Sequence, residues 1–268
     1  MKNRSNVFFA LLAMMAMPCA QAGGISDVGI NSYWGSDGHG YNDVIGNSTY
    51  DISGATITRV GSVLTVTIAT NFAGNAGAES GAAPGGIGYG DVFLAKTWNP
   101  FGTAADTHHA ADNASNGTLW SYGFNLDNRW SNTGGKFTLY KLNGANNAAN
   151  VLTSDSFMSC AIGTECYYRN GQATAVNSAA SNSANVYNTQ LTGDWTVSAG
   201  QLKFTINVAT SELLNFSSFA MHWGETCQND VIEGVTNVPL PGSLPLLGLG
   251  FGAMLMLRRR QAGLNARV

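Results

Sequence analysis

The chain lacks the sequence motifs by which common hydrolases are recognised. No G-x-S-x-G segment marks a nucleophile elbow, and no H-E-x-x-H segment marks the helix of a zinc protease. The acidic residues form no dense pattern that would indicate the paired carboxylates of a glycosidase. His108 and His109 lie with Asp106 and Asp112 in one polar stretch, which favours a solvated loop over a metal or acid–base site. The sequence therefore predicts that the protein is not an enzyme.

Basic residues are scarce between residues 23 and 237. Six of the thirteen lysines and arginines lie outside this stretch, whereas all sixteen acidic residues lie inside it. Seven basic residues therefore oppose sixteen acidic ones, which gives the stretch a formal charge of −9. Because an acidic surface repels phosphate backbones, this balance argues against nucleic acid as a partner.

The same stretch has no apolar period of 3.6 residues that persists beyond a turn or two. Short segments rich in alternating or β-branched residues recur instead, separated by turns rich in Gly and Asn. The segments expected to form strands are 57–69 (one long strand or a turn-broken pair), 91–95, 119–126, 136–142, 201–209 and 219–223. This pattern predicts one all-β domain over residues 23–237, an antiparallel β-sandwich or jelly roll. Ser211–Leu214 is expected to form a capped helical turn.

Two long stretches, 74–90 and 100–117, do not have the pattern of regular structure. The first is rich in Gly and Ala and is expected to be flexible, and the second is polar. Loops of this length in a compact domain tend to be functional or disordered.

Trp98 and Trp130 border loops, so they are the candidates for exposed aromatic rings that stack on sugars, whereas Trp120 and Trp223 are expected in the core. A carbohydrate-binding, lectin-like module is therefore the alternative to a structural role.

The N-terminus has the features of a signal peptide. Lys2 and Arg4 form a basic region, and an apolar segment follows at Val7–Met17. Ala20 and Ala22 then supply the small residues that signal peptidase requires. We expect cleavage after Ala22, so that residues 1–22 are a signal peptide and the domain is exported.

The C-terminus combines a proline motif, an apolar run and a cluster of arginines. Proline holds the V-P-L-P segment at 238–241 extended. Gly242–Leu257 is uncharged, and its sixteen residues would form a helix of roughly 24 Å, close to the thickness of a bilayer core. Because arginine clusters stay on the cytoplasmic side, Arg258–Arg260 place the domain outside the membrane and residues 261–268 in a cytoplasmic tail.

This C-terminal segment resembles the PEP-CTERM sorting signal of Gram-negative bacteria, which has the same three features in the same order. Leu240 stands where that family usually has Glu. The resemblance implies an exosortase-type membrane protease as a partner, which cuts near the proline motif and releases the protein to the cell surface. The residues matched to the signal are Val238, Pro239, Leu240, Pro241, Arg258, Arg259 and Arg260. An ordinary C-terminal anchor is the alternative.

The body of the chain also resembles exosortase-sorted surface proteins. The resemblance is carried by a strand-loop-strand run, GDVFLAKTWNPFG at 90–102, NGTLWSYGFNL at 116–126 and GGKFTLYKLNG at 134–144. It is also carried by FAMHWGETCQNDVIEG at 219–234, which contains a His-Trp pair, a Cys and an Asn-Asp pair close to the sorting signal. No activity comes with it. It implies a structural or adhesive role at the cell surface or in the exopolysaccharide matrix of a biofilm, with polysaccharide as a further partner and an extracellular hydrolase as the remaining alternative.

Three cysteines remain after the signal peptide, which is consistent with an oxidising compartment. Cys160 and Cys166 flank a five-residue loop and are the first choice for a disulfide bond. Cys227 leaves two other pairings open, between which the sequence does not decide. A zinc site is the competing interpretation, but no histidine lies at ligand spacing from the first pair.

Two similar segments lie near opposite ends of the domain, NDVIG at 42–46 and NDVIEG at 229–234. First and last strands of a sandwich are often neighbours, so Asp43 and Asp230 are expected to approach each other. Carboxylates are ligands suited to Ca²⁺. The two segments therefore predict calcium as a cofactor. The simpler interpretation is that each Asn-Asp pair caps a turn.

Overall fold

The computed structural model describes residues 22–27, 40–41, 44–45, 48–81, 83–100, 117–143, 149–159, 171–181 and 183–238, without the side chains of 22, 40, 41, 44 and 45. Residues 1–21 of the predicted signal peptide lie outside these ranges, whereas Ala22, the last residue assigned to it, is the first residue of a strand. The proline motif beyond Val238, the predicted transmembrane helix at 242–257 and the tail also lie outside these ranges. Within the described ranges, no helix has both the length and the apolar character needed to cross a bilayer.

The described residues form strands and four short 3₁₀ helices. The elements are β1 (Ala22–Ser26), β2 (Gly40–Tyr41), β3 (Val44–Ile45), η1 (Ser48–Tyr50), β4 (Ile52–Val60), β5 (Val63–Thr70), β6 (Val92–Ala95), β7 (Tyr122–Leu126), β8 (Gly134–Leu142), β9 (Val151–Thr153), η2 (Ser154–Ser156), β10 (Ala173–Val176), η3 (Ser178–Ala180), β11 (Val186–Ser198), β12 (Gln201–Asn207), η4 (Glu212–Asn215), β13 (Ser218–Gly224) and β14 (Val231–Asn237). The prediction of an all-β protein is confirmed.

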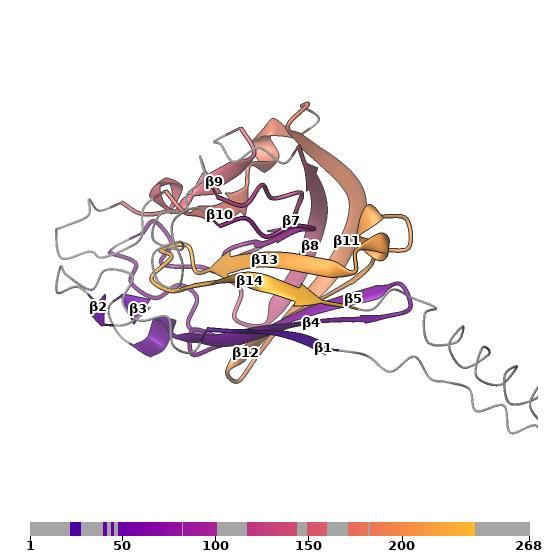
Figure 1. The fold of residues 1–268 in the computed structure, drawn as a ribbon. Coiled ribbons are helices and arrows are strands. Elements are labelled where there is room, and N and C mark those ends of the chain that lie inside the picture. Colours follow the sequence, from indigo (N-terminus) through magenta and orange to yellow (C-terminus); the bar gives the residue numbers. More distant parts are fainter. Residues whose placement is uncertain are drawn as a thin grey trace, which may run out of the picture.

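Ten strands form one continuous antiparallel sheet in the order β1-β4-β5-β12-β11-β8-β7-β6-β13-β14. The sheet is strongly curled and wraps around a single interior (Figure 1). Two small sheets, β9–β10 and β2–β3, complete the described part of the chain.

The predicted strands at 91–95, 119–126, 136–142, 201–209 and 219–223 coincide in whole or in part with β6, β7, β8, β12 and β13. The segment 57–69 is a turn-broken pair, because β4 and β5 are joined by a turn at Gly61, whose φ is +59°. The longest strand, β11, was missed. Its sequence is polar, and its ladder with β8 shifts register between Asn188 and Thr192, so it carries no uninterrupted alternation.

The interior of the curled sheet is filled by aliphatic and aromatic side chains. In β12, Leu202, Phe204 and Ile206 point inward and are buried, while the residues between them face solvent. The rings of Phe124 and Phe137 stack at 4.5 Å between centroids. Burial of this apolar surface is the main force that holds the ten strands together.

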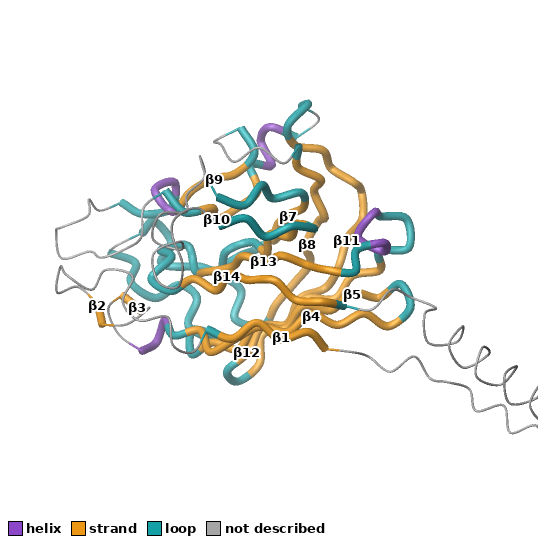
Figure 2. Tube along the Cα trace, in the orientation of Figure 1, coloured by secondary structure: helices purple, strands orange, loops and turns teal. Residues whose placement is uncertain are grey.

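A second, smaller core lies on the outer side of β6 and β13. Phe93, Trp120 and Ala220 pack there against Ala173 and Val176 of β10. β10 contacts β7, and Figure 2 shows the small sheet of β9 and β10 beside β7. Because β6 is covered on both faces, all four of its residues are buried, which explains its unbroken apolar sequence.

The loop at 74–90, predicted to be flexible from its composition, has two side chains in the core of the domain. Ile87 and Tyr89 are buried in the main core. The hydroxyl of Tyr89 accepts a hydrogen bond from the backbone N–H of Gly74 at 2.8 Å and donates one to Asn132 Oδ1 at 3.0 Å. These two residues anchor a segment that is otherwise rich in Gly and Ala. Residues 101–116, in the second predicted loop, lie outside the described ranges.

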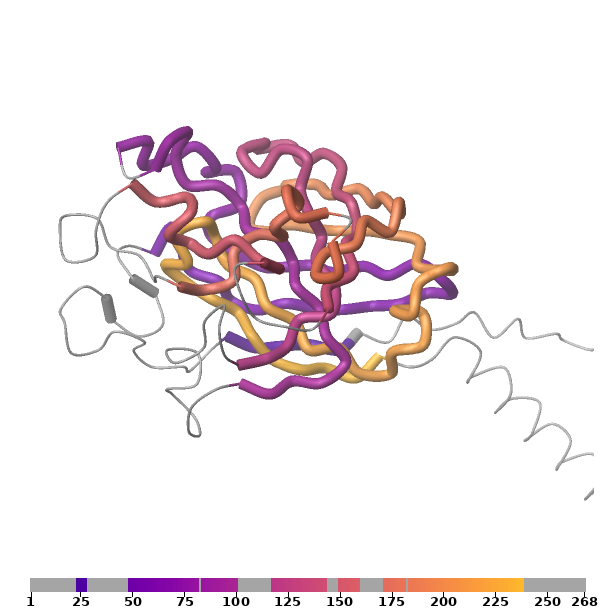
Figure 3. The backbone as a smooth tube through the Cα atoms, turned by 90° about the horizontal axis from the view of Figure 1, so that it is seen from above, coloured from indigo at the N-terminus to yellow at the C-terminus, as the bar shows by residue number. Residues whose placement is uncertain are grey.

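The first and last strands of the sheet lie side by side. A Cβ atom added to Gly23 would lie 1.9 Å from Thr236 Oγ1, and one added to Gly234 would lie 2.8 Å from Ile25 Cγ2. β1 and β14 are thus in direct contact, as Figures 1 and 3 also show, although no described ladder joins them. The contact brings the first and last strands of the sheet together, whereas the predicted approach of residues 42–46 to residues 229–234 stays a prediction, because Asp43 lies outside the described residues.

Candidate functional site

An arginine occupies an inward-facing position near the end of β4. Arg59 follows the buried Ile57 by two residues, so the alternation of the strand directs its side chain inward as well. Its Nη1 donates hydrogen bonds to the carbonyl oxygens of Leu213 and Phe216 at 3.0 and 2.8 Å. Its Nη2 donates to the carbonyl oxygen of Val238 at 3.3 Å. One buried side chain therefore joins β4, η4 and the last described residue.

Carbonyl oxygens and an aromatic face surround the charge of Arg59. The guanidinium carbon lies 5.8 Å from the centre of the Phe219 ring, within the range of a cation–π interaction. Burial lowers the pKa of Arg59 from its ordinary value, but a guanidinium stays protonated throughout the range in which proteins fold. The donors of a guanidinium lie in a fixed planar fork. A lysine at position 59 could therefore not reproduce the three contacts.

The side chain, the N–H and the carbonyl oxygen of Val238 all make contacts within the domain. Its side chain is fully buried in the main core. Its N–H donates to the carbonyl oxygen of Ser217 at 2.9 Å, and its carbonyl oxygen accepts from Arg59. The next residue in the sequence is Pro239, which has no N–H to donate. Val238, assigned to the sorting motif from the sequence, is thus part of the folded domain.

The turn that presents two of the carbonyls is itself fixed. Ser211 caps η4, because its Oγ accepts from the N–H of Leu213 at 3.2 Å, which confirms the predicted capped turn. Glu212 accepts from Lys141 Nζ at 3.0 Å and from the Tyr122 hydroxyl at 3.0 Å. The hydrogen bond from Lys141, followed by that from Tyr122, lowers the pKa of Glu212. These contacts tie η4 to β7 and β8, so its carbonyls are presented to Arg59 in a fixed position.

A second polar cluster lies on the outer side of β13 and β14. His222 and Glu233 are opposite one another in the ladder, with Nδ1 and Oε2 2.9 Å apart, and both are buried. His222 Nε2 lies 2.7 Å from the carbonyl oxygen of Ala173, and Trp98 Nε1 donates to Glu233 Oε1 at 2.8 Å. Because a carbonyl only accepts, Nε2 carries a proton. Both ring nitrogens are engaged within the protein, so the geometry does not support His222 as a catalytic base.

The hairpin between β13 and β14 is buried although its sequence is polar. The N–H of Thr226 donates to the Gly88 carbonyl oxygen at 2.8 Å, and Gln228 Nε2 donates to Thr174 Oγ1 at 3.2 Å. Asp230 Oδ2 accepts from a backbone N–H of β4, and Asp230 Oδ1 accepts from the N–H of Val231 at 2.7 Å. These hydrogen bonds join the hairpin to the loop before β6, to β10 and to β4.

Of the two residues predicted to bind calcium, the structure describes only Asp230. Asp43 lies outside the described residues, and Asp230 uses both carboxylate oxygens on backbone N–H groups. The described ranges contain no group of three His, Cys, Asp or Glu side chains arranged to hold a metal ion. Calcium binding stays a prediction, which calorimetric titration of the full chain with Ca²⁺ tests.

The two candidate tryptophans for sugar binding are not brought together. Trp98 follows β6 and Trp130 follows β7, and since these strands are antiparallel neighbours, the residues lie beyond opposite ends of the pair. Trp98 is half-buried, whereas Trp130 is 39% exposed and donates from Nε1 to the Gly86 carbonyl oxygen at 2.8 Å. Trp120 and Trp223 are buried, as predicted.

The predicted disulfide cannot be placed. Cys160 and Cys166 lie outside the described residues, and so do Pro239, Leu240, Pro241 and Arg258–Arg260 of the sorting motif. Cys227 is described and is fully buried in the main core, within the β13–β14 hairpin. All three cysteine pairings therefore stay open.

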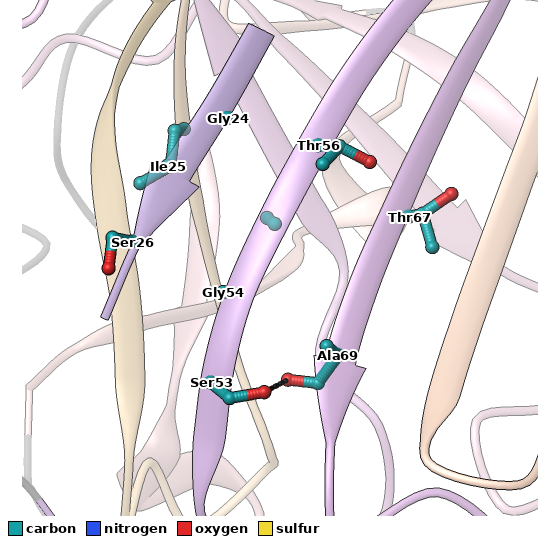
Figure 4. Close-up of a pocket in the computed structure, with 9 residues that line it drawn as sticks. Gly24, Ile25, Ser26, Ser53, Gly54, Thr56, Thr67 and Ala69 are labelled. Atoms are coloured by element: carbon teal, nitrogen blue, oxygen red, sulfur yellow. Dashed lines mark hydrogen bonds between the residues drawn. The ribbon is translucent and has the colours of Figure 1, made fainter. Parts of the chain in front are cut away.

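A shallow groove crosses the outer face of β1, β4 and β5 (Figure 4). Its volume is about 470 Å³. Ser53 Oγ donates to the carbonyl oxygen of Ala69 at 3.4 Å across its floor. Its lining residues are Gly24, Ile25, Ser26, Ser53, Gly54, Ala55, Thr56, Thr67 and Ala69, none of them charged or aromatic. The groove therefore supplies no ring on which a sugar could stack.

Sequence reasoning missed Arg59, His222 and Glu233. Arg59 left a usable signal, since it is a charged residue at an inward position of an otherwise regular strand. His222 was noted only as part of a His-Trp pair. Its partners come from β10, β14 and the segment after β6, and no local pattern connects them.

No protein-family model, curated protein or solved structure matched this chain.

Proposed function

We propose that the protein is an exported component of the cell surface or exopolysaccharide matrix of a Gram-negative bacterium, processed at a C-terminal sorting signal. Its role is structural or adhesive and not catalytic. The partner at the membrane is an exosortase-type protease, and extracellular polysaccharide is the partner after release. In the precursor, residues 1–22 direct export and residues 238–260 hold the chain in the membrane.

The observation that supports the proposal is the position of Val238, the last described residue, directly before the proline motif. This residue is fully buried, and the proline motif follows it with no spacer. Prolines at 239 and 241 favour an extended chain, the form in which proteases bind their substrates. The folded domain therefore leads directly into a segment suited to processing.

The adjacency of the two ends of the domain supports the same proposal. Gly23, the first residue after the predicted signal-peptide cleavage, contacts Thr236 near the end of β14. The first and last strands of the described domain therefore meet at one place. A protein attached to a membrane at that place, before or after either cleavage, leaves the remaining surface free for contacts outside the cell.

We further infer that the curled sheet is the single-sheet counterpart of the predicted β-sandwich or jelly roll. Its opposing strands share one core, as the two layers of a sandwich do. The difference is that each strand pairs with the next along the whole order from β1 to β14, so that one sheet stands in place of two.

Polysaccharide binding through a lectin-like site is the second candidate. It is favoured by the partial exposure of Trp130, and it would use this ring without Trp98. Replacing Trp130 with Ala would then abolish retention on the exopolysaccharide of the producing strain, while Trp98→Ala would not. An extracellular hydrolase is the third candidate, and no described feature favours it over the other two.

Mass spectrometry of the native protein tests the proposal. We expect an N-terminus at Gly23 and a C-terminus within or soon after the proline motif. An intact C-terminus in the membrane fraction would indicate a permanent anchor, and an untrimmed protein in the cytosol would exclude export. The control variant replaces Arg258, Arg259 and Arg260 with Ser, which should impair retention of the precursor and alter processing while leaving the folded domain unchanged.

A further inference from the structure

Gln228 has a backbone conformation that glutamine rarely adopts. Its φ is +52°, in the left-handed region that favours glycine, although the residue is fully buried in the turn between β13 and β14. The turn holds this conformation, because the N–H of Gln228 donates to the carbonyl oxygen of Glu225 at 2.9 Å. Strained residues that the surrounding structure keeps in place cluster at functional sites. The strain therefore directs attention to the side chain of Gln228.

The carboxamide of Gln228 is directed at a buried hydroxyl group. Its Nε2 donates to Oγ1 of Thr174 in β10 at 3.2 Å, and both residues are fully buried. Gly224 makes room for this carboxamide, because a Cβ at that position would lie 2.9 Å from Cδ of Gln228. The carboxamide carbon of Gln228 therefore packs against bare backbone and lies close to the threonine hydroxyl.

Thr174 is fixed in the same contact. Its hydroxyl donates to the carbonyl oxygen of Gln172 at 3.0 Å, and its carbonyl oxygen accepts from the N–H of Asp91 at 2.8 Å. A hydroxyl that can act as a nucleophile and a carboxamide that can act as an electrophile are thus held together out of water. Groups held in a fixed reactive geometry react as though each were present at about 10⁵–10⁸ M.

We propose that Thr174 and Gln228 form an intramolecular ester, a covalent bond between β10 and the β13–β14 hairpin. Oγ1 of Thr174 bonds to Cδ of Gln228, the Cδ–Nε2 bond breaks, and the hydroxyl proton passes to Nε2, which leaves as ammonia. The reaction needs no oxidant and no further reactant. Escape of ammonia into solvent draws it forward, and burial excludes the water that would hydrolyse the ester.

The ester closes a loop between positions 174 and 228 of the chain. A closed loop restricts the unfolded chain, in the way that a disulfide bond does, and so favours the folded domain. This inference goes beyond the proposed function and does not depend on it, because the bond forms within the folded domain whether or not the chain is processed at either end.

Peptide mapping of the purified full chain tests the bond. After denaturation and reduction, trypsin should release the peptide 170–203, which contains Thr174, joined to the peptide that begins at Phe204 and contains Gln228. The joined product should be lighter than the two peptides together by one ammonia, and hydroxylamine, which cleaves esters, should separate them. Two separate peptides that each have the mass of their sequence would overturn the proposal. So would a joined product that resists hydroxylamine.

Variants at position 174 identify the hydroxyl group that reacts. Thr174→Val keeps the shape of the side chain but removes the nucleophile, so its peptides should separate, whereas Thr174→Ser should keep the bond. Thr226→Val is the matched control, because Thr226 is buried in the same hairpin and its hydroxyl accepts from the N–H of Gly88 at 2.9 Å. It should keep the bond. A joined product in Thr174→Val would overturn the proposal, and the wild-type map decides the matter even if that variant does not fold.

Discussion

The carboxylate of Asp230 accepts a hydrogen bond from the backbone N–H of Ile52 at 2.6 Å, across 178 positions of the chain. This contact joins the start of β4 to the hairpin that precedes β14. Asp230 is fully buried, and its other oxygen holds the N–H of Val231. One carboxylate therefore supplies acceptors for two backbone groups where the edges of the sheet converge.

Replacing Asp230 with Ala should destabilise the domain strongly. It leaves two buried N–H groups without their acceptor, and we expect a loss of about 2–4 kcal/mol in the free energy of unfolding. Denaturant titration of the full chain measures this. The control is Asp194→Asn, at an exposed ion pair with Lys136, which should change the free energy by less than about 0.5 kcal/mol. Equal effects of the two substitutions would contradict the role given to Asp230.

Adjacent glycines of β1 should respond in opposite ways to a larger side chain. A Cβ at Gly23 meets Thr236 Oγ1 at 1.9 Å, whereas a Cβ at Gly24 meets nothing within 4 Å. Gly23→Val should therefore push β1 away from β14 and lower stability by about 1–3 kcal/mol. Gly24→Val should be neutral or slightly stabilising, because valine favours an exposed strand. Thermal melting compares the pair, and similar losses at both positions would show that the strands are not in contact.

The cluster of Glu233, His222 and Trp98 should behave as one unit. Glu233→Ala removes the partner of both rings inside a buried site, so we expect a loss of about 3–5 kcal/mol. Trp98→Phe removes only the N–H donor, and about 1 kcal/mol should be lost. In a double-mutant cycle the second change should cost almost nothing once Glu233 is Ala. Additive losses would show that Trp98 and Glu233 are not coupled.

Stability should decline at alkaline pH because of buried tyrosines. Burial, with a hydrogen bond to Glu212 as the next cause, raises the pKa of Tyr122 to about 12 from 10.0. Burial also raises the pKa of Tyr89. The unfolded chain loses these protons near pH 10, while the folded chain keeps them. The stabilisation is therefore complete below pH 10 and is lost as the pH rises through about 12.

Unfolding titrations at increasing pH measure this decline. Tyr122→Phe should be less stable than the wild type near neutral pH, because it loses the hydrogen bond to Glu212. Its stability should also fall less steeply above pH 10, because one titrating group is gone. An unchanged slope in Tyr122→Phe would mean that this hydroxyl ionises as freely in the fold as in the unfolded chain.

Alternation along the chain was enough to predict most central strands. Leu202, Phe204 and Ile206 lie at every second position. An antiparallel sheet with one buried face requires this spacing of apolar residues, whichever strands are its neighbours. β11 escaped prediction because a register shift interrupts its period, and Gln190 within it has a φ of +64°. β14 was missed because its inward residues include a glycine, which adds no apolar signal.

The candidate site was less predictable than the strands. The sequence assigned Val238 to a processing motif but gave no sign that this residue is buried and hydrogen-bonded within the domain. Its partner Arg59 donates to backbone carbonyl oxygens, and every residue has a carbonyl, so no sequence pattern identifies the contact. Likewise, Trp98 looked like a loop aromatic, and only the position of β14 revealed that its N–H is bound by Glu233.

The sequence by itself determined the class of the fold, because strand period, turn residues and inward apolar positions are local properties of the chain. It also determined the acid excess of the domain and the order of motifs at both ends. Only the tertiary structure decided that β1 meets β14, that Asp230 serves Ile52, and that Arg59 holds Val238. These contacts join residues far apart in the chain, and which of them form depends on how far the whole sheet curls.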